Sequence, residues 1–396
     1  MQSTVLSSLI DTLTPEERQA LLSDARLRTL PAVFAAIPDP RSRQGRRYAL
    51  SFLLTCVVAA LLCNCNTLAA VGQWCHDHER LLRRVFPHHR FLTPTGALLR
   101  WLLPRLSVSE LEWAIASWVQ QTRPLRDREP VGFDGKTVCG AATGDGRAPH
   151  LLSLSTHTTG ETLVQVRVDE KTNEIPVARA ILPYLRLRGR AITADALHTN
   201  AQTAQTILDQ HADYLLVVKR NQPTLYDECA AFFSDPTARV RRTTTIDRRR
   251  GRTETRTLYA TTQLNLHLMR YSSFPHIRQV ACLRTVTVDA TGTHEDVRFL
   301  LTSLAPRHAD PDRLLTLARG HWSIESRHYT RDVTFGEDRS SVRTGHAPQI
   351  MASLRNLALT LIHRSGTSEI ASYRRHLAAH PTQALRLLVP RTHSRR

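Results

Sequence analysis

Three acidic residues stand in local contexts that suit ligands of a divalent metal ion. Asp134 ends the apolar run 131–133, Asp195 follows the mostly apolar run 191–194, and Glu325 ends a stretch whose apolar residues recur at helical spacing. Mg²⁺ prefers carboxylate and phosphate oxygens, and two ions about 3.5–4 Å apart can activate an attacking oxygen and stabilise a leaving one. Singly, each Asp could be only a cap or turn residue. Together the three predict a nuclease-type metal site.

A polar stripe accompanies Glu325 on a predicted helix over 311–335. Its members fall at spacings that place them on one helical face: His321, Glu325, His328, Tyr329 and Asp332. A polar stripe can simply face solvent. Here it contains a carboxylate and two imidazoles, which favours a helix at the border of an active site, with His321 and Asp332 as auxiliary residues.

Two lysines are further candidates for the site. Of 53 lysines and arginines only three are lysines, an imbalance that a GC-rich genome would explain by itself. Lys136, however, lies two residues after Asp134, and Lys219 ends the apolar run 214–218. An ammonium is a compact, strongly hydrated charge, unlike a planar guanidinium. We therefore interpret Lys136 and Lys219 as site residues, with incidental lysines as the alternative.

The pattern of apolar residues divides the chain into regions. It predicts a helical extension over 1–30, a mostly helical domain over 31–125, a catalytic domain over 126–370 that contains a β-rich insertion at about 236–304, and a basic tail over 371–396. In the catalytic region the expected strands are 131–138, 150–157, 162–168, 190–195 and 213–219. Helical patterns occur near 176–185, 200–210, 311–335 and 347–363. Three strands followed by alternating helix and strand indicate an α/β fold.

The charge of the chain predicts a polyanionic partner. Its formal net charge is +18, with a pI near 10.5, and such a field attracts nucleic acid. We expect phosphate contacts from the arginines of the insertion, although a solvated charged hairpin is the alternative. These arginines are Arg248, Arg249, Arg250, Arg252 and Arg256.

Membrane and secreted classes are disfavoured. The apolar stretch 49–63 is too short to span a bilayer and lies too far into the chain for a signal peptide, so it predicts a buried helix. Seven scattered cysteines favour a reducing cytoplasm over a disulfide framework. A zinc site within 63–78 is the weaker reading, because its two-cysteine spacing is too tight.

Several segments together resemble a known family, the bacterial insertion-sequence transposases of the DDE type, in the ISAs-type branch that includes the H-repeat-associated proteins. The resemblance covers roughly residues 31–365. The matching segments of the catalytic region are 133–136, 171–175, 192–198, 219–222, 251–256, 321–325 and 332–338, and 37–41 with 45–48 look like the family's N-terminal associated domain.

The resemblance implies an RNase H-like catalytic domain with a β-rich insertion, in which Asp134, Asp195 and Glu325 bind two Mg²⁺ ions, with Mn²⁺ as a possible substitute. It adds Asn221, in segment 219–222, to the auxiliary residues. Ser326 stands where the family usually has Asn, and Tyr329 where it has Trp, which leaves catalytic efficiency open.

The implied function is transposition. The enzyme would cleave DNA at the ends of an insertion sequence and transfer the freed strand into target DNA, as a homodimer on double-stranded DNA in the bacterial cytoplasm and nucleoid. The alternatives are a nuclease on the same fold that cuts without joining, and a non-catalytic DNA-binding derivative. Intact carboxylates at all three positions argue against the derivative.

Overall fold

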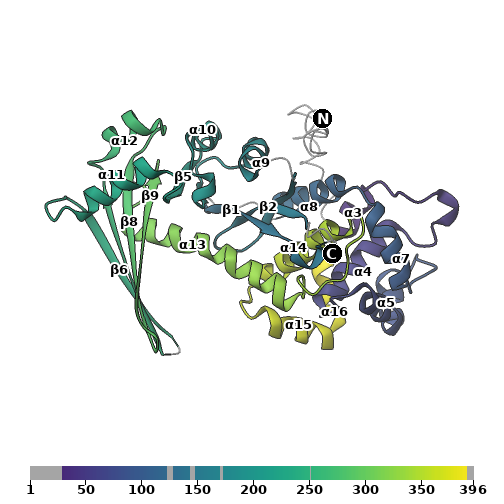
Figure 1. Ribbon diagram of the computed structural model, residues 1–396. Helices are drawn as coiled ribbons and strands as arrows, with labels where there is room; N and C mark the ends of the chain where they lie inside the picture. The colour runs from purple at the N-terminus through teal and green to yellow at the C-terminus, as the bar shows by residue number, and fades with distance from the viewer. Residues whose placement is uncertain (1–28, 123–127, 143–147, 170–172, 250, 390–396) are drawn as a thin grey trace, which may run out of the picture.

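The computed structural model describes residues 29–122, 128–142, 148–169, 173–249 and 251–389, apart from the side chain of Glu325. In Figure 1 a helical region forms one end of an elongated molecule and a set of long strands forms the other. The long helix α13 (Pro311–Tyr329) runs between the two ends. The predicted extension over 1–30 lies almost wholly outside the described residues.

The helical end is built around one apolar helix, α4 (Leu50–Leu62). Every residue of α4 except Ser51 is buried, as expected for a helix that is hydrophobic on all sides, so the sequence prediction of a buried helix is confirmed. Among the described residues no helix is long and apolar enough to cross a membrane. The other elements of this end are α3 (Leu30–Ala35), η2 (Arg43–Gly45), α5 (Leu68–Asp77), α6 (Glu79–Val85), α7 (Gly96–Leu102), η3 (Leu103–Arg105) and α8 (Val108–Thr122).

The region predicted to be catalytic contains the first five strands of the sheet, arranged as the expected RNase H-like fold requires. Antiparallel pairing joins β1 to β2 and β2 to β3, whereas β4 and β5 are parallel to β1, so the strand order is β3-β2-β1-β4-β5. The bounds are β1 (Val131–Thr137), β2 (His150–Thr156), β3 (Thr162–Val168), β4 (Ala191–Ala194) and β5 (Asp213–Val218). The connecting helices are η4 (Cys139–Ala141), α9 (Glu174–Ile181), η5 (Leu182–Tyr184), η6 (Ala196–His198) and α10 (Ala201–Asp209).

The predicted β-rich insertion extends this same sheet. Its last strand pairs antiparallel with β5, with Leu216 opposite Leu301, so nine strands form one sheet in the order β3-β2-β1-β4-β5-β9-β8-β7-β6. The strands are β6 (Arg241–Arg249), β7 (Arg252–Thr261), β8 (Gln279–Asp289) and β9 (Gly292–Thr302), with helices α11 (Pro223–Ser234) and α12 (Asn265–Ser272) beside them.

Two layers of helix cover the RNase H-like half-sheet. Helices α9 and α10 lie on one face, and α13 lies on the other, where it contacts β1 and β4. Helix α13 approaches the sheet closely because a glycine lies on each side of the contact, Gly132 on β1 and Gly320 on α13. A Cβ at Gly132 would lie 2.6 Å from Ile324 Cδ1, and one at Gly320 would lie 2.2 Å from His157 Nδ1. After α13 the chain forms a π-helical turn, η7 (Thr330–Thr334), and then α14 (Ala347–Arg364).

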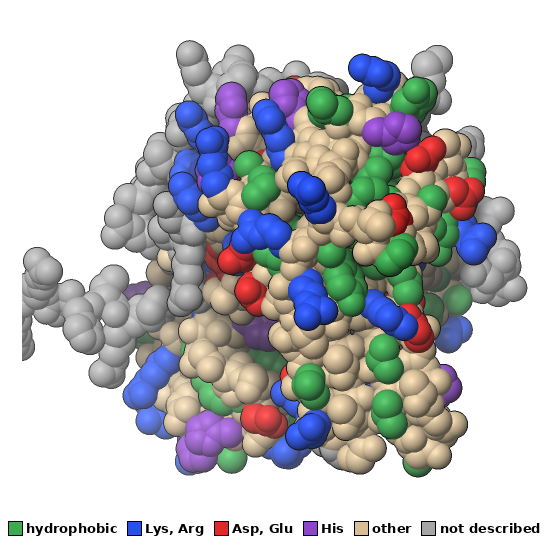
Figure 2. Space-filling model, turned by 90° about the vertical axis from the view of Figure 1, so that its left-hand side faces the viewer, with side chains coloured by type: hydrophobic (Ala, Val, Ile, Leu, Met, Phe, Trp, Pro, Cys, Tyr) green, Lys and Arg blue, Asp and Glu red, His purple; other side chains and the backbone are tan. Residues whose placement is uncertain are grey.

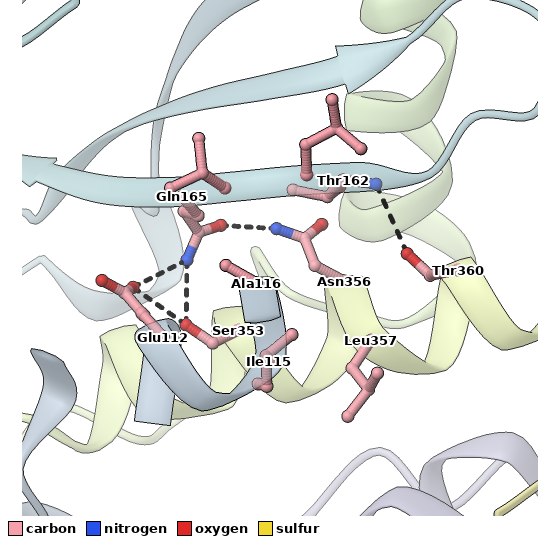
Figure 3. Close-up of a pocket in the computed structure, with 11 residues that line it drawn as sticks. Glu112, Ile115, Ala116, Thr162, Gln165, Ser353, Asn356, Leu357 and Thr360 are labelled. Carbon is pink, nitrogen blue, oxygen red and sulfur yellow. Dashed lines mark hydrogen bonds between the residues drawn. The ribbon is translucent and has the colours of Figure 1, made fainter. Parts of the chain in front are cut away.

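A buried polar network joins the helical end to the sheet. Glu112 of α8 is 5% exposed, and its Oε1 accepts hydrogen bonds from Gln165 Nε2 of β3 (3.2 Å), and from Gln349 Nε2 (3.0 Å) and Ser353 Oγ (3.0 Å) of α14. Figure 3 shows Glu112, Gln165 and Ser353 converging from α8, β3 and α14 beside a small pocket. The N-terminal helices therefore share a core with α14, and the proposed boundary near 125 stays a prediction.

The segment expected to be a basic tail is folded up to residue 389. It contains α15 (Ile370–Ala379) and α16 (Pro381–Leu388), which pack against α4. Arg374 is buried and donates to the carbonyl oxygen of Leu61 through Nε (3.0 Å) and Nη2 (2.6 Å), while its guanidinium lies 3.9 Å from the Phe335 ring centroid. Some of the basic residues at this end are thus structural.

Candidate active site

Asp134 of β1 and Asp195, the residue directly after β4, lie at neighbouring positions of two parallel strands. In the β1–β4 register Phe133 is opposite Ala194, and Asp134 and Asp195 are the next residues on each side. Neighbouring strands are about 4.8 Å apart, so two residues 61 positions apart in sequence are brought side by side, Asp134 in the middle of β1 and Asp195 directly after the end of β4.

Alternation along β1 decides which face each side chain occupies. Gly132, Asp134 and Lys136 face α13, since their contacts are Ile324, His328 and Asp332. Phe133 and Gly135 face α9 instead, against His198 and Glu174. On β4, Thr193 contacts His321 of α13, and Asp195 has an extended backbone, so it shares the α13 face with Asp134.

Several hydrogen bonds hold the turn that carries Asp195. Its Oδ1 accepts from the backbone N of Leu197 (3.1 Å), the capping arrangement that starts η6. Asn221 Nδ2 donates to the carbonyl oxygen of Ala196 (2.8 Å), and Thr199 Oγ1 donates to that of Val217 (2.6 Å). The predicted auxiliary residue Asn221 is therefore placed to support this turn. Lys219 is exposed at the carboxyl end of β5.

Helix α13 brings two described imidazoles to the aspartates. His321 Nδ1 lies 3.1 Å from Thr193 Oγ1, which in turn lies 2.7 Å from His157 Nε2. His328 Nδ1 lies 3.5 Å from Asp134 Oδ2. Position 325 lies four residues after His321 and three before His328, hence on the same helical face. The side chain at position 325 lies outside the part of the chain that the structure describes. Among the described residues, no three His, Cys, Asp or Glu side chains form a metal-binding group.

Burial keeps both imidazoles uncharged near neutral pH. It lowers the pKa of His328 to about 3, helped by the positive charges of Arg331, Lys136 and Arg327. It lowers the pKa of His321 to about 4, although the negative charge of Asp195 opposes the change. The approach of His328 to Asp134 is thus not an ion pair at neutral pH. Neither imidazole adds a positive charge that would repel a cation from the aspartates.

Lys136 and Asp332, both predicted as auxiliary residues, pair with each other. Lys136 Nζ lies 2.5 Å from Asp332 Oδ1 and 4.0 Å from Glu337 Oε1. Glu337 is fully buried; burial tends to raise its pKa, but the charges of Arg331, Arg355 and Lys136 outweigh it and the pKa is lowered. The Lys136 side chain is 7% exposed. This leaves it little surface for a DNA phosphate and makes it a link between β1 and η7.

Sequence reasoning assigned no role to a group on the opposite face of the sheet. Glu174, the first residue of α9, accepts from His150 Nε2 through Oε1 (2.6 Å) and from His198 Nε2 through Oε2 (2.9 Å). Two features of the sequence could have drawn attention to Glu174: it directly follows the helix cap Asn173, and it lies in a segment that matches the family.

The predicted DNA-binding arginines separate into two groups. Arg248, Arg249 and Arg252 are exposed near the tip of the β6–β7 hairpin. Arg256 is instead 10% exposed and lies 2.5 Å from Asp247 and 2.6 Å from Glu254, so it is held in internal ion pairs. Arg250 lies outside the described residues. Figure 2 shows this end of the molecule, with basic side chains spread over the whole face.

Comparisons with known proteins agree with this geometry. The family described as "Transposase DDE domain" matches residues 134–361, beginning at Asp134, and the family "DDE_Tnp_1-associated" matches 32–119. "Putative transposase YncI" of Escherichia coli O157:H7 is 26% identical over 340 residues, 83% of this chain and 85% of that protein. "H repeat-associated putative transposase YhhI" of E. coli K12 is 22% identical, over 85% and 90% of the two chains.

The structure was also compared with that of a solved piggyBac transposase synaptic complex with hairpin DNA. The TM-score between the two chains is 0.43 and their sequence identity is 11%, and the match covers 96% of this chain and 82% of that one.

An RNase H-like sheet with one aspartate in β1, another directly after β4, and an acidic position on the helix that crosses them, is the arrangement expected of a DDE-type transposase domain. This chain belongs to the transposase DDE domain family, with an associated domain before it. Its relatives include H repeat-associated proteins, so the family expected from the sequence motifs is confirmed. Proteins of this family use divalent metal ions.

Proposed function

We propose that this protein is a DNA transposase that cleaves DNA at the ends of its insertion sequence and joins the freed 3′-hydroxyl to target DNA. Asp134, Asp195 and Glu325 are the proposed ligands of two Mg²⁺ ions, which Mn²⁺ can replace. The observation that carries the proposal is the β1–β4 register, which puts Asp134 and Asp195 side by side beneath α13.

The residues present fit such ions. Two carboxylates on one face supply the hard oxygen donors that Mg²⁺ requires. His321 and His328 beside them are uncharged, so they do not compete with a metal ion for the negative charge of the aspartates. When bound, a metal pair supplies charge stabilisation for the attacking and leaving oxygens. The chain's own contribution is to hold Asp195 through its tethered turn and to fix α13 over β1.

The proposed substrate is double-stranded DNA, both the terminal repeats and the target, bound by a homodimer in the cytoplasm and nucleoid. The net charge of +18 supports a polyanionic partner. The exposed arginines Arg248, Arg249 and Arg252 at the β6–β7 tip are proposed to contact phosphates, with Lys219 as a further contact near the site. Arg256 is omitted because of its internal ion pairs.

Single replacement of each acidic residue tests the proposal. We expect Asp134→Ala, Asp195→Ala and Glu325→Ala each to abolish Mg²⁺-dependent cleavage of the element's own ends while DNA binding persists, because each removes a ligand and no basic surface. Asp209→Ala, which removes an exposed carboxylate at the end of α10, is the matched control and should cleave normally. Full turnover by any of the three variants would refute the assignment.

A pre-cleaved end separates the remaining alternatives. A transposase joins a supplied 3′-hydroxyl end to target DNA, whereas a nuclease on the same fold cuts the intact end and joins nothing. Binding of the ends with neither reaction, in either Mg²⁺ or Mn²⁺, would identify a non-catalytic DNA-binding derivative.

A further inference from the structure

We propose that Glu174 is a positioning residue that braces Asp134 and Asp195 from the far side of the sheet through His150 and His198. The inference rests on the proposed function, since it concerns the geometry of the metal-binding pair. It assigns a role to a carboxylate outside the acidic triad.

Glu174 is unsuited to bind a metal ion itself. Both carboxylate oxygens already accept hydrogen bonds, Oε1 from His150 and Oε2 from His198; an ionised carboxylate can only accept, so both imidazole nitrogens must donate. It also lies on the α9 face of β1, whereas Asp134 points to the α13 face. The carboxylate is therefore behind the proposed site rather than in it.

The contact with β1 is direct and needs a glycine. A Cβ at Gly135 would lie 2.1 Å from Glu174 Oε1 and 2.7 Å from His150 Nε2. The carboxylate thus rests on the backbone of the residue that follows Asp134. Since Oε1 is also bonded to His150 on the neighbouring strand β2, Glu174 cannot easily swing away.

The contact with Asp195 runs through its turn. His198 is the last residue of η6, which Asp195 caps, and it is fully buried with its ring packed edge-on against Phe133, 4.4 Å between centroids. The bond from His198 to Glu174 therefore fixes the far end of the turn, as Asn221 fixes its start. One carboxylate restrains the backbone after both aspartates.

The Glu174 carboxylate stays ionised at any pH at which the protein would be assayed. Burial raises its pKa, but the hydrogen bonds and charges of His150 and His198 act in the opposite direction and bring the pKa to about 2. Glu174→Gln keeps the size of the side chain but removes the charge and one acceptor. Groups that orient metal ligands typically contribute about 10- to 100-fold in metal affinity or activity, so we expect the aspartates to bind metal at least about tenfold more weakly.

The test measures Mn²⁺ binding to the full chain without DNA, by calorimetric titration, beside the melting temperature. Wild type should bind Mn²⁺ and Asp195→Ala should not. Glu174→Gln should raise the Mn²⁺ dissociation constant about tenfold. The matched control is Glu161→Gln, a buried carboxylate paired with Arg364 at 2.9 Å beyond the other end of β2; it should lower the melting temperature and leave Mn²⁺ affinity unchanged.

Three outcomes are distinguishable. Wild-type binding that Asp195→Ala does not change overturns the proposed function. Asp195-dependent binding that is equally tight in Glu174→Gln overturns the positioning role alone. If Glu174→Gln fails to fold, His150→Leu carries the test: this partly exposed side chain supplies one of the two bonds, and a leucine has no donor to replace it. Its replacement should weaken Mn²⁺ binding severalfold, whereas unchanged affinity would overturn the inference.

Discussion

Replacing Glu112 by glutamine should make the protein more stable above neutral pH. This carboxylate lies in the network that joins α8, β3 and α14, and its Oε1 accepts all three of the hydrogen bonds described above. Figure 3 draws two of them, from Gln165 and Ser353. Burial raises its pKa to about 7, although the bonds from Gln349, Gln165 and Ser353 favour the ionised form. A glutamine oxygen can accept the same three bonds and never ionises.

The size of the effect follows from proton linkage. The unfolded carboxyl has a pKa of 4.5 and the folded one a pKa of about 7, so between these values the folded chain binds more protons and stability falls as pH rises. The stabilisation that the protonated Glu112 gives the folded state is fully present below about pH 4.5 and is lost above pH 7. At about 1.4 kcal/mol per pKa unit, the loss is roughly 3 kcal/mol.

Urea unfolding at pH 4.5 and pH 8 measures this directly. The free energy of unfolding of Glu112→Gln minus that of wild type should rise by roughly 3 kcal/mol between the two pH values. Glu79→Gln, on the exposed side of α6, should show no such trend. A difference that is constant with pH, or a glutamine variant that is less stable at pH 8, would show that Glu112 does not titrate in this way.

Two further predictions concern the basic residues. Replacing Arg248 and Arg249 together with alanine should reduce the slope of log binding constant against log salt concentration by roughly 0.9 for each lost phosphate contact. Arg256→Ala should instead lower stability and leave this slope unchanged. Equal slopes for all variants would show that the hairpin arginines are solvated and do not contact DNA phosphates. Lys136→Met should lower the free energy of unfolding by about 3 kcal/mol, because Asp332 and Glu337 lose a buried cation. Lys219→Met should instead leave stability unchanged and weaken DNA binding, and the reverse pattern would contradict the roles derived for the two lysines.

The local pattern of the sequence was sufficient to predict most individual elements. The strands that position Asp134 and Asp195 were expected at 131–138 and 190–195 and are found at Val131–Thr137 and Ala191–Ala194, so that Asp195 directly follows its strand. Apolar runs bounded by turn residues carry this information within a few residues of chain. The apolar helix α4 and the long helix α13 were predictable for the same reason.

Contacts between distant segments were not predictable in this way. Nothing in residues 213–219 shows that β5 pairs with β9, about 85 positions later, and nothing near Lys136 shows that its partner is Asp332 rather than a phosphate. Glu174 was visible as part of a matching segment, but its role depends on Gly135 of β1, His150 of β2 and His198 of η6. Register and face decide these contacts, and both are properties of the assembled sheet.

The pairing of β5 with β9 also orders the assembly of the protein during synthesis. A ribosome has already delivered Asp134 and Asp195 when β5 emerges, but β5 keeps one open edge until residues 299–302 arrive to pair with it, and α13 follows only after that. An open strand edge readily joins another chain. Nascent chains interrupted within the insertion would therefore carry Asp134 and Asp195 without position 325 and with an exposed strand edge, so we expect them to aggregate or be degraded rather than to persist.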